Sequence, residues 1–176
     1  AEVHDVLIAR TQPRVDGTLG RGVVVQQHAV VSLTRSALVD NRELGLFASE
    51  NQTTVEGSQV LITQTKAVAD GLGGQGVNVQ DGAALTLEKS ALVDNHYVGL
   101  LVRNDDTTVE VSATLIAGTQ PHSEGTGGQG INVQSGADLA LRQSALVDNH
   151  DIGLFATEGG TTAEVTETLI ARTEPS

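Results

Sequence analysis

The six residues SALVDN occur three times in this chain, at 36–41, 90–95 and 144–149, so the copies are separated by a constant offset of 54 in the numbering. Other short motifs keep the same offset: Gly-Leu at 45–46, 99–100 and 153–154, Thr-Thr at 53–54, 107–108 and 161–162, and Leu-Ile at 7–8, 61–62, 115–116 and 169–170. A fixed period of this size indicates an architecture that stacks one structural unit. The 176 residues hold three units and a fragment of a fourth.

Each unit divides into two unequal halves. Gly76 opens one half, Gly99 opens the next and Gly130 opens the one after, so successive halves differ in length, at 23 and 31. The extra residues of the longer half fall in the segments TQPRVDGTLGR, TKAVADGLGGQ and TQPHSEGTGGQ, whose Gly, Pro and charged residues are typical of loops. Each half is therefore predicted to be one turn of a coil, and alternate turns carry a long loop.

Within a half, apolar residues recur at every second position, which indicates β-strands. The residues predicted to face inward are Val77, Val79, Leu85 and Leu87. A third short strand contains Leu92, and we expect its match in the other half to be Leu115. A helical repeat is disfavoured, because no run of ten residues keeps a helical spacing of apolar residues. Three short strands per half predict a β-solenoid.

The stretch GVNVQDGAALTLEKSALVDNHYVGLLV and its two partners resemble the right-handed parallel β-helix repeats of the pectin-lyase-like superfamily, whose coils carry a G-I-x-V…L-x-x-S…N…G-I rhythm. The resemblance covers nearly the whole chain. It implies an all-β fold, a single right-handed parallel β-helix over residues 1–176, with about 22–23 residues per coil and two coils per repeat. Because neither end carries a polar cap, we expect the chain to be an excerpt of a longer repeat protein or to stack end to end.

The recurrence of SALVDN then has a structural explanation. In a coil, Ser, Leu and Asn each return to one angular position, where they pack against or hydrogen-bond to the neighbouring coils. Asn41, Asn95 and Asn149 are predicted to form a structural ladder whose side-chain amides cap backbone groups at a turn.

Composition excludes several classes of function. A formal charge of −12 disfavours nucleic acid and anionic membrane surfaces as partners, because both attract clustered Lys and Arg. The apolar runs are too short for a transmembrane helix, and the absence of Cys excludes disulfides and thiolate metal sites.

The resemblance implies carbohydrate lyases, hydrolases or epimerases as one functional class, since those enzymes place catalytic Asp on one sheet of this fold. The pair Asp105 and Asp106 is the candidate, but the equivalent residues elsewhere are Asn-Gln at 51–52 and Gly-Gly at 159–160, which favours a solvated turn. His96, His150 and Asp151 follow SALVDN and are also expected to face solvent. No catalytic residue and no cofactor is predicted.

Two ligand hypotheses concern repeated polar residues. In successive long loops a Gly is preceded by an acidic residue: Asp16, Asp70 and Glu124. Two coils, or about 9.6 Å, separate one from the next, which is too far for two of them to bind the same Ca²⁺. Only a separate weak Ca²⁺ site in each loop remains open. The Thr-Thr pairs suggest an ice-binding array, but Glu56, Glu110 and Glu164 interrupt the same strands, which disfavours it.

One predicted row is apolar and faces outward: Phe47, Leu101 and Phe155. Alternation along the strand places these residues opposite the inward-facing Leu46 and Ala48, which makes them candidates for binding a partner. The alternative is that they pack along the sheet or under the long loops.

The functional hypothesis is a non-enzymatic spacer, scaffold or adhesive stalk of a secreted or cell-surface bacterial protein, which binds a protein or polysaccharide through an exposed face. The alternatives are a carbohydrate-binding or carbohydrate-active β-helix, and a subunit that self-assembles into filaments. The repetition favours the first, because enzymes of this fold break the repetition at one unique cleft.

Overall fold

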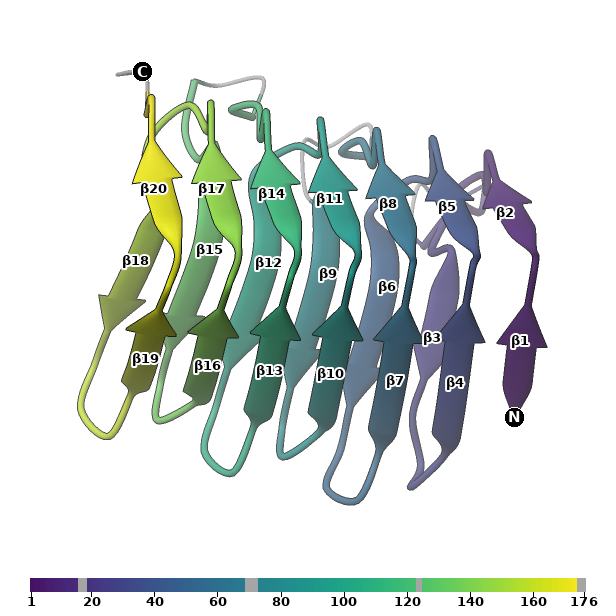
Figure 1. Cartoon of the computed structure of the whole chain (residues 1–176). Coiled ribbons are helices and arrows are strands. Elements are labelled where there is room, and N and C mark those ends of the chain that lie inside the picture. The colour runs from purple at the N-terminus through teal and green to yellow at the C-terminus, as the bar shows by residue number, and fades with distance from the viewer. Residues whose placement is uncertain (16–18, 69–72, 123–124, 174–176) are drawn as a thin grey trace.

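The computed structural model describes residues 1–15, 19–68, 73–122 and 125–173, and it is all-β over those residues. The strands form three parallel sheets that run along a rod, as Figure 1 shows. Sheet A contains β1 (Glu2–His4), β4 (Val30–Thr34), β7 (Thr54–Ser58), β10 (Ala84–Glu88), β13 (Thr108–Ser112), β16 (Asp138–Arg142) and β19 (Thr162–Thr166). Sheet B contains β2 (Leu7–Ala9), β5 (Ala37–Val39), β8 (Leu61–Thr63), β11 (Ala91–Val93), β14 (Leu115–Ala117), β17 (Ala145–Val147) and β20 (Leu169–Ala171).

Sheet C contains β3 (Val23–Val25), β6 (Leu44–Ser49), β9 (Gln75–Gln80), β12 (Val98–Arg103), β15 (Gln129–Gln134) and β18 (Leu154–Thr157). The chain visits the three sheets in turn, so each circuit is one coil. Every strand except those at the ends of the sheets pairs with the equivalent strands of the coils before and after it. The prediction of a parallel β-helix is confirmed.

The register shows how two unequal coils make one repeat. In sheet C, Leu46 pairs with Val77 across the longer coil, and Val77 pairs with Leu100 across the shorter one. The two steps together make one full repeat, and the longer step contains a long loop, as predicted. Every SALVDN copy is therefore two coils from the next, and its immediate neighbours belong to the other half of the repeat.

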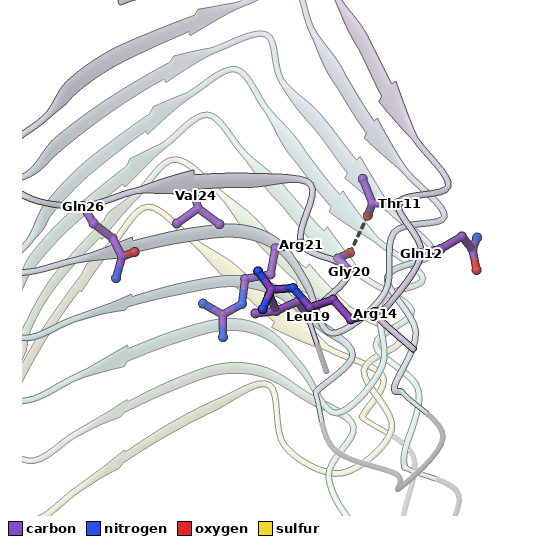
Figure 2. A pocket seen from close by; sticks show the side chains of 8 residues that line it. All are labelled: Thr11, Gln12, Arg14, Leu19, Gly20, Arg21, Val24 and Gln26. Atoms are coloured by element: carbon purple, nitrogen blue, oxygen red, sulfur yellow. Dashed lines mark hydrogen bonds between the residues drawn. The ribbon is translucent and has the colours of Figure 1, made fainter. Parts of the chain in front are cut away.

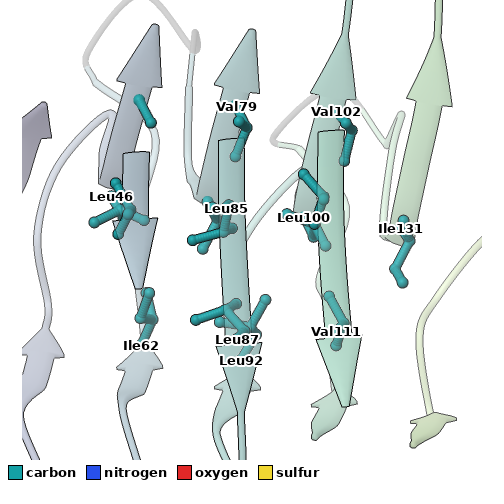
Figure 3. Close-up of a cluster of buried hydrophobic side chains, with 14 of the residues drawn as sticks. Leu46, Ile62, Val79, Leu85, Leu87, Leu92, Leu100, Val102, Val111 and Ile131 are labelled. Carbon is teal, nitrogen blue, oxygen red and sulfur yellow. The ribbon is translucent and has the colours of Figure 1, made fainter. Parts of the chain in front are cut away.

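The core is a narrow column of branched aliphatic side chains inside the coil (Figure 3). Val77, Val79, Leu85 and Leu87 are all buried in it, as their alternation indicates. Sheet B contributes the central residue of each three-residue strand from β2 to β17, such as Leu92 and Ile116. Few large rings are needed, because each layer is filled by side chains of the layers above and below.

One predicted match between the halves is wrong. Leu92 pairs with Ile116, whereas Leu115 pairs with Ala91 and is exposed. A shift of one residue moves a strand's side chains to the opposite face of the sheet. A three-residue strand is too short for alternation to reveal that shift in the sequence.

Candidate functional site

The asparagines of the SALVDN copies occupy the corner between sheets B and C. The side chain of Asn95 is buried, its Oδ1 accepts the backbone N–H of Thr65 at 3.0 Å, and its Nδ2 donates to the carbonyl of Ile62 at 3.0 Å. Asn149 makes the same two bonds to Thr119 and Ile116. Each asparagine therefore caps backbone groups of the preceding coil. The asparagines alternate with threonines and do not stack on one another.

The glycine that opens each strand of sheet C is required by this corner. A Cβ on Gly76 would lie 2.6 Å from the carbonyl oxygen of Gly99 and 2.8 Å from the amide nitrogen of Asn95. Only a residue without a side chain fits between the buried amide and the next coil. The same contacts recur at Gly22 and Gly130.

Similar polar columns occupy the other two corners. Ser90 Oγ lies between sheets A and B, where it accepts the N–H of Val60 at 3.1 Å and donates to the carbonyl of Glu88 at 2.9 Å. Thr107 Oγ1 lies between sheets C and A and accepts the N–H of Gly82 at 2.9 Å. Buried polar groups of this kind satisfy the backbone at each turn and link successive coils.

The predicted apolar row on the outside of sheet C is not a continuous exposed stripe. Phe47 and Leu101 are only 7% and 6% exposed, whereas Phe155 is 37% exposed. Phe155 lies on β18, at the end of the sheet, so one of its sides lacks a neighbouring strand. The expectation of exposure therefore holds only at the end of the row, and a partner-binding role for the three residues stays a prediction.

Phe47 is covered by a residue that precedes sheet C in the chain. The guanidinium of Arg21 lies 4.7 Å from the centre of the Phe47 ring, and Arg21 Nη2 donates to Glu43 Oε1 at 2.7 Å. A cation over an aromatic face is stabilising when both are partly desolvated. Sequence alternation alone could not reveal this cover, because it depends on a loop residue that returns over the sheet.

The same loop borders a cavity of about 600 Å³ beside the first strand of sheet C (Figure 2). Arg14, Leu19, Arg21 and Val24 contribute to its lining, and Thr11 Oγ1 donates to the carbonyl of Gly20 across its edge. The cavity occurs at the first long loop, and of the two arginines that line it Arg21 is paired with Glu43.

The acidic candidates fall into two groups, of which the structure describes only one. Asp105 and Asp106 lie in the exposed turn between β12 and β13. Asp16, Asp70 and Glu124, the candidates for weak Ca²⁺ sites, lie outside the described residues. Among the residues that the structure describes, no group of three or more His, Asp or Glu side chains is placed to hold a metal ion.

His96 and His150 occupy equivalent positions at the corner after sheet B, and both are partly buried. Burial lowers the pKa of His96 below its ordinary value, and the positive charge of Lys66 lowers it further. The ring of His122 meets Tyr97 edge-on, with centroids 6.1 Å apart. Asp151 follows His150 and is also partly buried.

The outer face of sheet A is polar. In the Thr-Thr pair at 107–108 one side chain points inward and the other outward: Thr107 is fully buried, whereas Thr108 is exposed. Glu56 and Glu110 are exposed on alternate strands, with Thr86 between them in register. The glutamates thus interrupt the face, as the sequence predicts.

The outer face of sheet B is apolar, which alternation in the sequence did not predict. The first and third residues of every sheet B strand point outward, and they are Leu, Ala or Val except for Thr63. The leucines Leu7, Leu61, Leu115 and Leu169 are 67%, 39%, 38% and 57% exposed. We call these outward residues of β2, β5, β8, β11, β14, β17 and β20 the sheet B face. The repeated Leu-Ile pair is the sequence signal that could have identified it.

This arrangement of three parallel sheets around a column of stacked aliphatic side chains defines a parallel β-solenoid. The family model for the right-handed β-helix region matches residues 11–170, so the chain belongs to the right-handed β-helix family and the predicted hand is confirmed. No curated protein and no solved structure matches the chain. Within the described ranges there is no helix long and apolar enough to cross a membrane.

Proposed function

We propose that the chain is a non-enzymatic structural segment, a rigid spacer or scaffold, of a secreted or cell-surface bacterial protein. The observation that supports this most is the repetition of the three polar columns. Asn95 and Asn149 make the same pair of bonds two coils apart, and Ser90 and Ser144 do likewise. These buried Asn and Ser side chains thus hydrogen-bond each coil to the backbone of its neighbour.

A solenoid joined in this way has a length set by the number of repeats. Each repeat adds two coils, or about 9.6 Å, without changing the cross-section of the rod. The continuous parallel pairing of seven strands in sheets A and B resists bending and stretching along the whole length. These are the properties that a spacer between two functional parts requires.

The first experiment changes the number of repeats. Inserting a second copy of residues 65–118, one repeat in register, should lengthen the rod by about 9.6 Å in small-angle X-ray scattering while leaving the cross-sectional radius unchanged. The unfolding transition should stay cooperative and move to higher temperature. A longer chain that becomes flexible, or whose cross-section widens, would argue against a rigid spacer.

A second experiment addresses the carbohydrate alternative. The chain is incubated with a panel of acidic and neutral polysaccharides, and both retention and the release of new reducing or unsaturated ends are followed. Release would overturn the structural role and direct attention to Asp105 and Asp106. Retention without release, lost in Phe155→Ala, would make the chain a glycan-binding module.

A further inference from the structure

The sheet B face carries a regular pattern of large and small side chains. In β2, β8, β14 and β20 the first outward residue is Leu and the second is Ala or Thr. In β5, β11 and β17 the first is Ala and the second is Val. Each strand therefore presents one larger and one smaller residue, and their order reverses from one coil to the next. The resulting surface alternates projections and hollows in both directions.

We propose that the sheet B face binds the sheet B face of a second copy of this chain, with the two rods side by side and parallel. The two-fold axis of this dimer runs along the rod direction between the two faces. Rotation by 180° about that axis keeps every coil at its own height and exchanges the two outward rows. Leu115 of one copy then faces Ala117 of the other, and Ala91 faces Val93. A larger residue meets a smaller one in every coil.

The charges at the rims of the face match the same arrangement. The corner residues before and after the face have opposite charges in four coils: Asp5 and Arg10, Arg35 and Asp40, Lys89 and Asp94, Glu167 and Arg172. All eight share one backbone conformation, with φ between 47° and 58°, so they occupy equivalent places on their four coils. The parallel two-fold brings the first member of each pair opposite the second member of the same pair in the other copy.

Some of these rim charges already pair between coils of one chain. Arg35 donates to Asp5 at 2.7 and 2.8 Å, and Arg172 Nη2 donates to Asp148 at 2.8 Å. Such pairs fix the charged groups at the two edges of the face. In the dimer each of the four charged pairs meets its own reversed pair, so opposite charges face each other at both rims in four coils. A polar rim of this kind gives an interface its register.

The antiparallel alternative is disfavoured by the same residues. In this arrangement the two-fold axis runs parallel to β11, between the two faces, and the second rod points the opposite way. Lys89 then lies opposite Lys89, Asp94 opposite Asp94, and leucines opposite leucines. Like charges in contact disfavour a wrong pairing. Sliding the antiparallel copy by one strand restores the matching of large and small residues but retains fewer opposite-charge pairings than the parallel arrangement.

The size of the face is sufficient for a dimer that depends on concentration. Seven strands about 4.8 Å apart and five residue steps from corner to corner give a footprint of about 500 Å² per copy, or about 1,000 Å² in total, at the lower limit of specific interfaces. The proposal goes beyond the spacer role, because a rod that stays monomeric can still separate two parts of a protein.

The test measures mass by sedimentation equilibrium at increasing protein concentration. The chain should pass from 18.2 kDa toward twice that mass, whereas Leu61→Glu/Leu115→Glu should stay at 18.2 kDa. The matched control, Thr86→Glu/Thr108→Glu, places the same charges on the outer face of sheet A and should associate as the unmodified chain does. Circular dichroism checks that each variant keeps its β-structure. A chain that stays monomeric, or a leucine variant that still associates, would overturn the proposal.

The orientation is tested separately, by cysteine crosslinking in this cysteine-free chain. An equal mixture of Ala145→Cys and Val147→Cys chains places two thiols opposite each other in the parallel dimer. Because packed sheets lie about 10 Å apart, a bifunctional maleimide of that span should join them into a covalent dimer. The antiparallel dimer centred on β11 places β17 opposite β5, out of reach of the reagent.

The control for crosslinking is an equal mixture of Thr108→Cys and Glu110→Cys chains, whose thiols lie on the outer face of sheet A. This mixture should remain uncrosslinked at the same protein concentration. Association of the sheet B mixture without crosslinking, or equal crosslinking of both mixtures, would contradict the parallel arrangement.

Discussion

Sheets A and B share one rod and differ on their outer faces. Both contain seven parallel strands, and both bury aliphatic residues such as Leu87 and Ile116 on the inner side. Outside, sheet A presents Thr108 and Glu110, whereas sheet B presents Leu115 and Ala117. Packing of the core requires apolar residues only on the inner side of each sheet. The apolar outer face of sheet B is thus a property beyond what packing of the core needs, and the proposed dimer would cover it.

The largest effect should come from placing a charge inside either sheet. Leu87→Asp in sheet A and Ile116→Asp in sheet B each bury an unpaired carboxylate, at a cost of about 5 kcal/mol or more, and should abolish the cooperative unfolding transition. Thr86→Asp, one position away and outward, is the matched control and should unfold nearly as the unmodified chain does. A cooperative Ile116→Asp would show that the register of sheet B is wrong.

A smaller contrast separates neighbouring residues of one strand. Ile116→Ala removes a fully buried side chain and should lower the free energy of unfolding by about 2–5 kcal/mol. Leu115→Ala should change it by less than about 1 kcal/mol when measured at low concentration, because that side chain is already partly in solvent. Urea denaturation of the two variants gives both values. Equal losses would mean that the two faces of sheet B do not differ as described.

Next in size is the corner between sheets B and C. Asn95→Ala leaves the buried N–H of Thr65 without its acceptor and removes one donor from the carbonyl of Ile62, and should cost about 1–3 kcal/mol. Asn51→Ala changes the same residue type in an exposed turn and serves as the control. Urea midpoints that shift equally in both variants would contradict a structural role for the buried amide.

The sequence was sufficient to predict the fold and to predict which residues of sheet A point inward and which point outward. A period of 54, divided into 23 and 31, determines the number of coils, and five-residue strands such as β10 show their alternation openly. The three-residue strands of sheet B do not, which is why the sequence matches Leu115 to Leu92 incorrectly. The same brevity conceals the apolar face.

The contacts of the candidate site were harder to predict from the sequence. Phe47 lies on the outer side of its strand as alternation predicts, yet its burial depends on Arg21 from the preceding loop. The asparagine ladder depends on the other half of the repeat, because Thr65 and Thr119 lie between successive asparagines. Contacts between coils join residues that lie far apart in the chain, and no local pattern encodes which side chains meet.

The smallest expected effect concerns pH, at the corner where sheet B ends. Burial lowers the pKa of His96 in the folded chain, with Lys66 adding a positive charge nearby. The unfolded chain therefore binds a proton at His96 at a higher pH than the folded chain does. The stability that the neutral ring contributes is present above about pH 6.5 and is lost as the pH falls toward the lowered folded value. Urea midpoints measured from pH 7.5 to pH 5 should decline, and His96→Gln should flatten part of that decline. An unchanged slope in His96→Gln would assign the pH dependence to other titratable groups, and this corner would then contribute nothing to it.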